Sequence, residues 1–164
     1  MPVVKNIEPS AVLPRTAWQS ALAETSVEVF AIMAGATITA SASDAPQASA
    51  EVTGIVGIGG AIRANFIPQC SSAASIKIAS QMLGISPEDP NAQKAACDAL
   101  GEICNIVAGY FKARIGLGDK CMLSVPMIVV GHDYKFRSRE SYERLEVLLL
   151  YEGQTLGATL EVAR

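Results

Sequence analysis

Histidine is nearly absent from this chain of 164 residues, and its scarcity limits the chemistry that the chain can perform. The one histidine, His132, lies in a Gly-His-Asp turn with no cysteine beside it. Catalytic triads and many metal centres use histidine as a base or as a ligand. The sequence therefore argues against a histidine-based triad and against a metal site on this chain.

Basic residues are not in surplus, and long apolar runs are missing. The chain has 13 Lys and Arg residues against 16 Asp and Glu residues, for a net charge of −3. Because nucleic-acid binding needs concentrated positive charge, we expect no nucleic-acid partner. No apolar run reaches the roughly 18 residues of a membrane-spanning helix. The N-terminal MPVVKNIEPS lacks the layout of a secretory signal, so we expect a cytoplasmic protein with no membrane partner.

Cysteine pairs with metal-binding or redox spacing are missing too. None of the four cysteines belongs to a C-x-x-C motif, which argues against zinc. In a cytosolic chain, buried free thiols are the usual state of such residues. The residues concerned are Cys70, Cys97, Cys104 and Cys121.

Half of the residues are hydrophobic, and the length suits one domain covering residues 1–164. Apolar periodicity predicts where the helices and strands lie. Helices are expected over 16–33 (capped by Thr16 and ended by Gly35), over 73–83 (capped by Ser71 or Ser72 and ended by Gly84), and over about 90–112. Strands are expected over 36–43, over 50–67 as a hairpin turning at Gly59-Gly60, over 121–131, and over 143–163 as two strands around Glu152-Gly153.

Prolines and glycines refine this assignment. Pro68 is expected to break its strand, and Pro126 to lie at an edge or a break, because proline cannot donate to a strand ladder. The glycine cluster over 54–60 fits neither a dinucleotide fingerprint nor a Walker loop, and a strand follows it. We therefore interpret that cluster as part of a hairpin.

The order of elements predicts an α+β fold. Runs of strands alternate with helices without strict βα alternation, which indicates a mainly antiparallel sheet of about six strands with three helices on one face. The two halves also resemble one another, since each begins with a long amphipathic helix and ends in a hairpin at Gly60 or Gly153. Alignment of the helices pairs Ser20 with Asp98, Glu24 with Glu102 and Val27 with Asn105. We therefore predict a duplicated helix-plus-strands unit.

The stretch 92–112 carries the residues of greatest chemical interest. Its apolar side is formed by Leu100, Ile103, Val107, Tyr110 and Phe111, with Ala99 at the margin. Its polar side carries Asp98, Glu102 and Asn105 at helical spacing, together with Gly101 and Gly109.

A solvated helix surface is the ordinary interpretation of such a polar row. Two details favour contact with another protein instead. Each glycine costs a helix about 1 kcal/mol relative to alanine, which a merely wet surface would not require. Asparagine is also a poor helix former, so Asn105 needs a reason beyond propensity.

The pattern D-x-x-x-E-x-x-N on a long helix, followed by a proline in a strand, resembles the CheC/CheX/FliY phosphatases of bacterial chemotaxis. The matching residues are Asp98, Glu102, Asn105 and Pro126. A single intact motif, with VTGIVGIGG, ASQMLG and VPMIVVG, is most similar to the CheX branch. Pro126 stands closer to the asparagine than in the family pattern, so we interpret it as mainly structural.

The resemblance implies a substrate and a set of roles. The substrate would be the phosphoaspartate of a CheY-like response regulator, which carries its own Mg²⁺, so no cofactor is expected on this chain. Asn105 would position the attacking water and Glu102 would anchor the regulator as the second catalytic residue. Asp98, Gly101 and Gly109 would contact that partner. No metal site is implied.

The resemblance also implies a homodimer with strands exchanged between subunits, and the charged segment 131–144 is a candidate for that exchange. The same charges are equally typical of an exposed edge that avoids pairing. One alternative function is a non-catalytic adaptor that docks on a response regulator or on the flagellar switch through the same helix. A small-molecule sensor is a third possibility, but no polar cluster in a pocket supports it.

Overall fold

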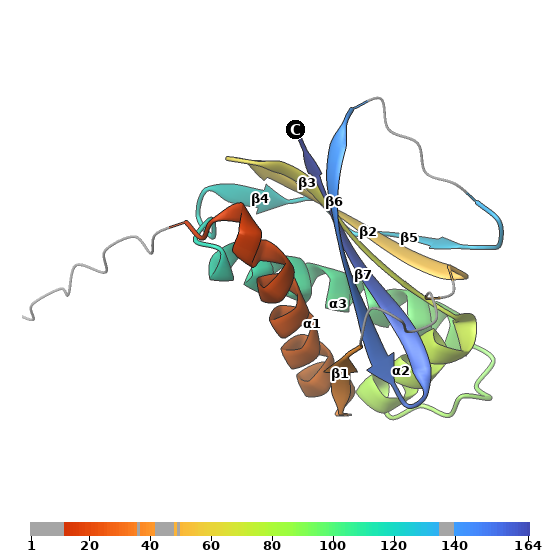
Figure 1. Ribbon diagram of the computed structural model, residues 1–164. Helices are drawn as coiled ribbons and strands as arrows, with labels where there is room; N and C mark the ends of the chain where they lie inside the picture. The colour runs from red at the N-terminus through yellow and green to blue at the C-terminus, as the bar shows by residue number, and fades with distance from the viewer. Residues whose placement is uncertain (1–11, 36, 42–47, 49, 135–139) are drawn as a thin grey trace, which may run out of the picture.

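The computed structural model describes residues 12–35, 37–41, 48, 50–134 and 140–164. Within these ranges, three helices lie on one side of a seven-stranded sheet (Figure 1). The helices are α1 (Trp18–Ala34), α2 (Ser72–Leu83) and α3 (Ala92–Arg114), with a 3-10 turn, η1 (Arg15–Ala17), before α1. The strands are β1 (Ile38–Ala40), β2 (Val52–Gly60), β3 (Arg63–Cys70), β4 (Cys121–Leu123), β5 (Met127–Val130), β6 (Tyr142–Tyr151) and β7 (Gln154–Ala163). The predicted α+β class is confirmed.

The sheet confirms the predicted duplication and shows how the halves interlock. Its order is β1-β6-β7-β3-β2-β4, with β5 also paired to β2, and all pairings are antiparallel. The hairpins β2–β3 and β6–β7 meet through β3 and β7 at the centre. The short strand after each long helix pairs with the other half: β1 with β6, and β4 and β5 with β2. Each half therefore completes the sheet of the other.

The core lies between the sheet and the helices. Alternate residues of the strands point toward the helices, among them Val56, Phe66 and Leu160, which are fully buried. Burial of each such side chain stabilises the fold by about 1.5–3 kcal/mol. Trp18 of α1 packs edge-on against Phe111 of α3, with ring centroids 6.1 Å apart. This contact fixes α1 against α3.

The ends of the helices agree with their sequence signals in part. Gly35 and Gly84 adopt the left-handed conformation that closes α1 and α2. The Ser71 hydroxyl accepts a hydrogen bond from the Ala74 amide at 3.1 Å and caps α2. The prediction that Thr16 caps the first helix is wrong. Thr16 lies inside η1, and α1 follows with Ala17 at its N-cap and no side-chain cap.

The prediction that Pro68 breaks its strand is also wrong. Pro68 lies inside β3, a central strand, where it is paired with Ala158 of β7. On its other side, the β2–β3 pairing is interrupted at Pro68, so the missing N–H falls where no ladder bond is made. Pro126 behaves as predicted, because it lies in the break between β4 and β5 at the edge of the sheet.

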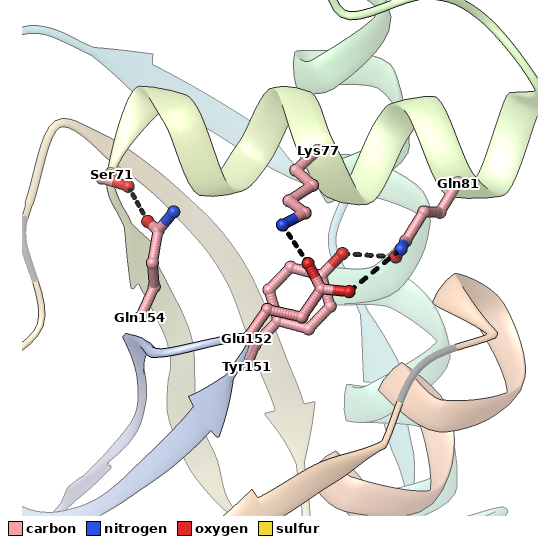
Figure 2. Close-up of polar contacts among 6 residues, drawn as sticks. All are labelled: Ser71, Lys77, Gln81, Tyr151, Glu152 and Gln154. Atoms are coloured by element: carbon pink, nitrogen blue, oxygen red, sulfur yellow. Dashed lines mark hydrogen bonds and ion pairs between the residues drawn. The ribbon is translucent and has the colours of Figure 1, made fainter.

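A group of polar contacts joins α2 to the β6–β7 turn (Figure 2). Tyr151 is hydrogen bonded to the Gln81 side chain, whose amide lies 3.4 Å from Glu152, and Glu152 is ion paired with Lys77. The Ser71 hydroxyl donates to the side-chain carbonyl of Gln154 at 2.7 Å. Burial, together with the nearby Glu152 carboxylate, raises the pKa of Tyr151 to about 12. These contacts tie the end of the first half to the hairpin of the second.

Two other predicted segments differ from the structure or lie partly outside it. Of the strand predicted over 36–43, the structure assigns Ile38–Ala40, and positions 36, 42 and 43 lie outside the described residues. The predicted exchange arm over 131–144 includes 135–139, which also lie outside them. Among the described residues, every helix is too short or too polar to cross a lipid bilayer.

Candidate functional site

Helix α3 carries the candidate site on the side that faces away from the core. Its opposite side presents Leu100, Ile103, Val107 and Phe111, all buried as predicted. Ala99 is buried as well, in a small cluster with Ala79 and Ala96. The amphipathic periodicity thus fixes how α3 is rotated against the sheet, and with it the direction in which its polar row points.

Cys104 shows how closely α3 approaches β2. A Cβ atom on Gly54 would lie 2.4 Å from the Cys104 Sγ, so this position of β2 requires glycine. Burial, with a smaller contribution from the neighbouring Cys70, raises the pKa of the Cys104 thiol to about 12. The structure gives free cysteines at all four positions, with Cys97 half-buried and the other three buried. The prediction of buried free thiols is confirmed for Cys70, Cys104 and Cys121, but not for Cys97.

Tyr110 is the one member of the predicted apolar face that the structure contradicts. Its side chain is 61% exposed, whereas the others are buried. The sequence placed Tyr110 within the apolar side of the helix, but packing against the sheet and α1 leaves most of its side chain in solvent. Tyr110 instead lines a shallow apolar groove between α1 and α3. The groove is lined by Val29, Ile32, Met33, Ile106, Gly109, Tyr110 and Ala113.

The polar row is open to solvent. Asp98 and Glu102 are exposed, and Asn105 is half-buried. Glu102 follows Asp98 by one helical turn, and Asn105 follows Glu102 by nearly one more, so the three project from one side. Among the described residues, their side chains form no hydrogen bond or ion pair. The two carboxylates and the carboxamide are therefore available to an incoming molecule.

The two glycines of α3 lie beside the β4–β5 segment. A Cβ atom on Gly101 would lie 3.9 Å from the Pro126 Cγ, and one on Gly109 would lie 3.9 Å from the Leu123 Cδ1. Both are ordinary van der Waals distances, so packing inside the chain would accept alanine at either position. The connection from β4 to β5 thus runs along the helix between the levels of Gly109 and Gly101, and passes Asn105.

Lys112 fixes this arrangement, a role that the sequence did not reveal. Its Nζ donates to the carbonyl of Gly118 and, at 2.8 Å, to the carbonyl of Cys121 at the start of β4. The ammonium group therefore holds the turn after α3 close to the helix. Lys94 is exposed near the start of α3.

The row has a counterpart on α1, as the duplication predicts. Ser20 and Glu24 are exposed and Val27 is half-buried. Glu24 lies 3.5 Å from Arg114, which also binds Glu28 at 2.6 Å. The first half therefore has no carboxamide at the matching position, and its glutamate is engaged inside the chain. Only the second half keeps the Asp-Glu-Asn set.

The chemical capacity of the row follows from its side chains. A carboxamide offers both an acceptor oxygen and an NH₂ donor, and it does not change charge with pH. Two carboxylates beside it favour cationic groups on a partner. Among the described residues, no three His, Cys, Asp or Glu side chains come together in a way that would hold a metal ion. The arrangement suits positioning and recognition.

The exposure of several apolar side chains on the β4–β5 segment was missed by the reasoning from sequence. The β4–β5 segment exposes Met122 (81%), Val125 (87%), Met127 (62%) and Val130 (50%). The signal was present as apolar residues on both sides of Pro126, but that run was interpreted as a strand alone. The strand register places Met122 and Met127 on the face of the sheet away from the helices, and Val130 on the helix side.

Comparison with known proteins identifies the family. The family model for "Chemotaxis phosphatase CheX" matches residues 52–149, which include all of α3 and the short strands β4 and β5. This chain belongs to the CheX family. A curated relative, the CheY-P phosphatase CheX of Thermotoga maritima, is 32% identical over 85 residues. That alignment covers 51% of this chain and 54% of the relative.

Solved structures of CheX proteins share the fold. Chemotaxis protein CheX of Vibrio vulnificus matches with a TM-score of 0.73 and 21% identity, over 92% of this chain and 98% of that one. CheX in the Borrelia burgdorferi CheX-CheY-BeF3-Mg complex matches with a TM-score of 0.72 and 18% identity, over 90% of this chain and 98% of that one.

Proposed function

We propose that this CheX-family chain hydrolyses the phosphoaspartate of a CheY-like response regulator in the cytoplasm. Asn105 positions the attacking water and Glu102 anchors the regulator, while Asp98, Gly101 and Gly109 contact it. The main support is that Glu102 and Asn105 project together from α3, with no partner among the described residues. Family membership and a relative named CheY-P phosphatase point to the same activity. The Borrelia relative was crystallised with CheY, which supports the choice of partner.

The reaction needs little covalent help from this chain. The oxygen of one water attacks phosphorus while the bond between phosphorus and the aspartyl oxygen breaks. The products are the free aspartate carboxylate and dihydrogen phosphate, which keeps both protons of the water. Phosphoryl transfer of this kind depends mainly on position and electrostatics. The regulator would bring its own Mg²⁺ and lysine, and Glu102 would pair with that lysine.

The amide of Asn105 suits the water-positioning role. Its oxygen accepts a hydrogen bond from the water, which directs the lone pair of the water toward phosphorus. Its NH₂ group donates toward the phosphoryl oxygens, where negative charge lies. Since α3 is packed along its length against the core, the amide is held on a rigid support.

The test measures phosphate release from the phosphorylated receiver domains of response regulators, which are taken from the same genome as this chain. The rates obtained with the wild type, Asn105→Ala and Asn105→Gln are compared. We expect Asn105→Ala to lose on the order of a hundredfold or more in rate, as when one transition-state donor is removed. Asn105→Gln keeps the amide but displaces it, and should also be slow. Equal rates for the wild type and Asn105→Ala would overturn the catalytic proposal. If Glu102→Ala then lost binding, the chain would be an adaptor.

We also propose that the chain forms a homodimer by exchanging the 131–144 segment between subunits. The place of that segment directly after the edge strand β5 supports this proposal. Sedimentation equilibrium of the wild type should give twice the mass of the chain. A monomer at micromolar concentration would contradict it.

A further inference from the structure

The apolar groove beside Tyr110 is formed by both long helices. Its two sides carry Ile32 of α1, which is 77% exposed, and Tyr110 of α3, which is 61% exposed. Val29 lines it from below and is buried in the core, and Gly109 and Ala113 leave space between the helices. The groove has a volume of about 480 Å³, comparable to sites that enclose a small ligand. Two large apolar side chains exposed around one groove are typical of an interaction site.

The duplication accounts for the pair of exposed side chains. Ile32 and Tyr110 occupy equivalent positions of the two halves under the alignment that pairs Ser20 with Asp98. The first half lacks the carboxamide of the polar row, yet it keeps a large exposed apolar residue at this position. It therefore contributes half of the groove without contributing to the chemistry.

The groove begins where the polar row ends. Ile106 follows Glu102 by about one helical turn, and Gly109 follows Asn105 by the same number of residues. Both Ile106 and Gly109 line the groove. A protein that contacts Glu102 and Asn105 from solvent therefore also covers the near end of the groove.

The charges around the groove limit what can occupy it. Among the described residues, its lining contains no charged side chain. Arg114, which follows the lining residue Ala113, is already ion paired with Glu28 at 2.6 Å. Glu102, one turn before Ile106, has no partner within the described part of the chain. An occupant therefore needs an apolar side chain for the groove and a cationic group beside it for Glu102.

We infer that the groove between α1 and α3 binds an apolar side chain of the receiver domain whose phosphoaspartate reaches Asn105. This inference rests on the proposed function, in which a lysine of the receiver pairs with Glu102. It adds that the first half of the chain, through Ile32, supplies affinity for the substrate protein. The receiver must then present an apolar side chain near that lysine.

A second copy of this chain is the competing occupant. The proposed exchange of 131–144 places the contact between copies after the edge strand β5, which leaves the groove between the helices open. A copy seated in the groove would also cover Ile106 and Gly109, and would crowd the approach to Asn105. The receiver satisfies both the apolar and the cationic requirement, so the groove is assigned to it.

The decisive variant is Ile32→Ser in the full chain, because Ile32 lies on a different helix from Asn105. Tyr110→Ser changes the other side of the groove, and Ile32→Leu and Tyr110→Phe are the conservative variants. Leu150→Ser is the matched control. Leu150 is 38% exposed and follows the buried Leu149 in β6, so it faces away from the helices.

For each protein, kcat and KM are measured with the phosphorylated receiver, and Kd with the beryllofluoride-treated receiver. The mass in solution is measured by sedimentation. We expect Ile32→Ser and Tyr110→Ser each to raise KM and Kd about tenfold, the effect of losing one interface anchor. Their kcat should stay within about twofold of the wild type, because the transition-state contacts of Asn105 are intact. The conservative variants and Leu150→Ser should behave as the wild type.

Unchanged KM and Kd in Ile32→Ser would overturn the inference, whatever Tyr110→Ser gives. A lower mass in solution for either serine variant would also overturn it, because the groove would then belong to the contact between copies.

Failure of the proposed function gives a different result. If the wild type binds the beryllofluoride-treated receiver but releases no phosphate, catalysis is wrong, and the Kd values of the groove variants alone decide the docking inference. If the wild type neither binds nor hydrolyses any receiver, both are wrong.

Discussion

Gly54 of β2 and Cys104 of α3 face one another so closely that a methyl group on the glycine would lie 2.4 Å from the cysteine sulfur. The same methyl group would lie 3.1 Å from Pro68 on β3. This contact sets the separation between the sheet and the helix that carries the polar row. It therefore links the core to the position of Asn105.

Gly54→Ala should destabilise the fold by about 1–3 kcal/mol, as expected of overpacking in a core. Cys104→Ala removes the sulfur and leaves room for the new methyl group. We therefore expect the double variant to be more stable than the sum of the two single effects predicts. Urea unfolding of the four proteins measures this coupling. Strict additivity would contradict the contact.

Gly101→Ala and Gly109→Ala should separate folding from partner binding. Both glycines are in α3, and a Cβ atom at either position would make only ordinary contacts. Each alanine should therefore stabilise the protein by about 0.5–1 kcal/mol through helix propensity. If a regulator approaches the helix here, the same changes should raise KM. A gain in thermal stability with an unchanged KM would remove the two glycines from the partner surface.

Glu102 should contribute to regulator binding through its negative charge. Glu102→Gln keeps the shape of the side chain but removes the pairing expected with a lysine of the regulator. We expect KM to rise about tenfold at low salt, and to depend less on ionic strength than in the wild type, because exposed charges are screened by salt. Glu161→Gln is the control, since Glu161 lies on the central strand β7. Parallel salt curves for the wild type and Glu102→Gln would argue against an ionic anchor.

The cysteines should differ in reactivity. Burial raises the pKa of both Cys70 and Cys104 to about 12, whereas Cys97 is half-buried on α3. A disulfide reagent at pH 8 should therefore label Cys97 first, and should reach Cys70 and Cys104 only as the protein unfolds. Mass mapping of the labelled peptides gives the order. Labelling of Cys70 as fast as Cys97 would contradict the burial.

The same shifts determine how stability changes in alkali. The ordinary thiol pKa is 9.0, and the folded value for each of the two residues is about 12. Above pH 9 the unfolded chain loses these protons and the folded chain keeps them, so stability should fall as the pH rises from about 9 toward 12. Cys104→Ala should show a weaker decline than the wild type between these limits. The unfolding midpoints in urea at pH 8 and pH 10.5 provide the comparison.

Local signals predicted the helices well. The apolar spacing along α3 is sustained over many turns, and Gly35 and Gly84 end their helices as expected. The hairpin turns at Gly60 and at Glu152-Gly153 were likewise readable, because both glycines take the positive φ that such turns need. The rotation of α3, and hence the direction of Asn105, followed from the same periodicity.

The errors at Pro68 and Tyr110 have a common cause, because both depend on contacts with residues far away in the sequence. Pro68 is tolerated in β3 because the pairing with β2 is interrupted there, and that depends on strands far apart in the sequence. Tyr110 is exposed because periodicity gives the angle of a side chain but not how far its neighbours extend. The exposure of Met122, Val125, Met127 and Val130 was missed because it depends on this segment forming the edge of the sheet. The sequence of the segment alone is typical of an ordinary strand.

The pairing of β1 with β6, and of β4 and β5 with β2, has a consequence for the origin of the molecule. Neither half can satisfy its own sheet edges, so a protein built from one unit would need a second copy to complete the same sheet. After two such genes had fused, one half could accumulate substitutions while the other half stayed under selection. Such a history would leave the arrangement seen here. Glu24 on α1 is paired with Arg114, whereas Glu102 on α3 is accessible.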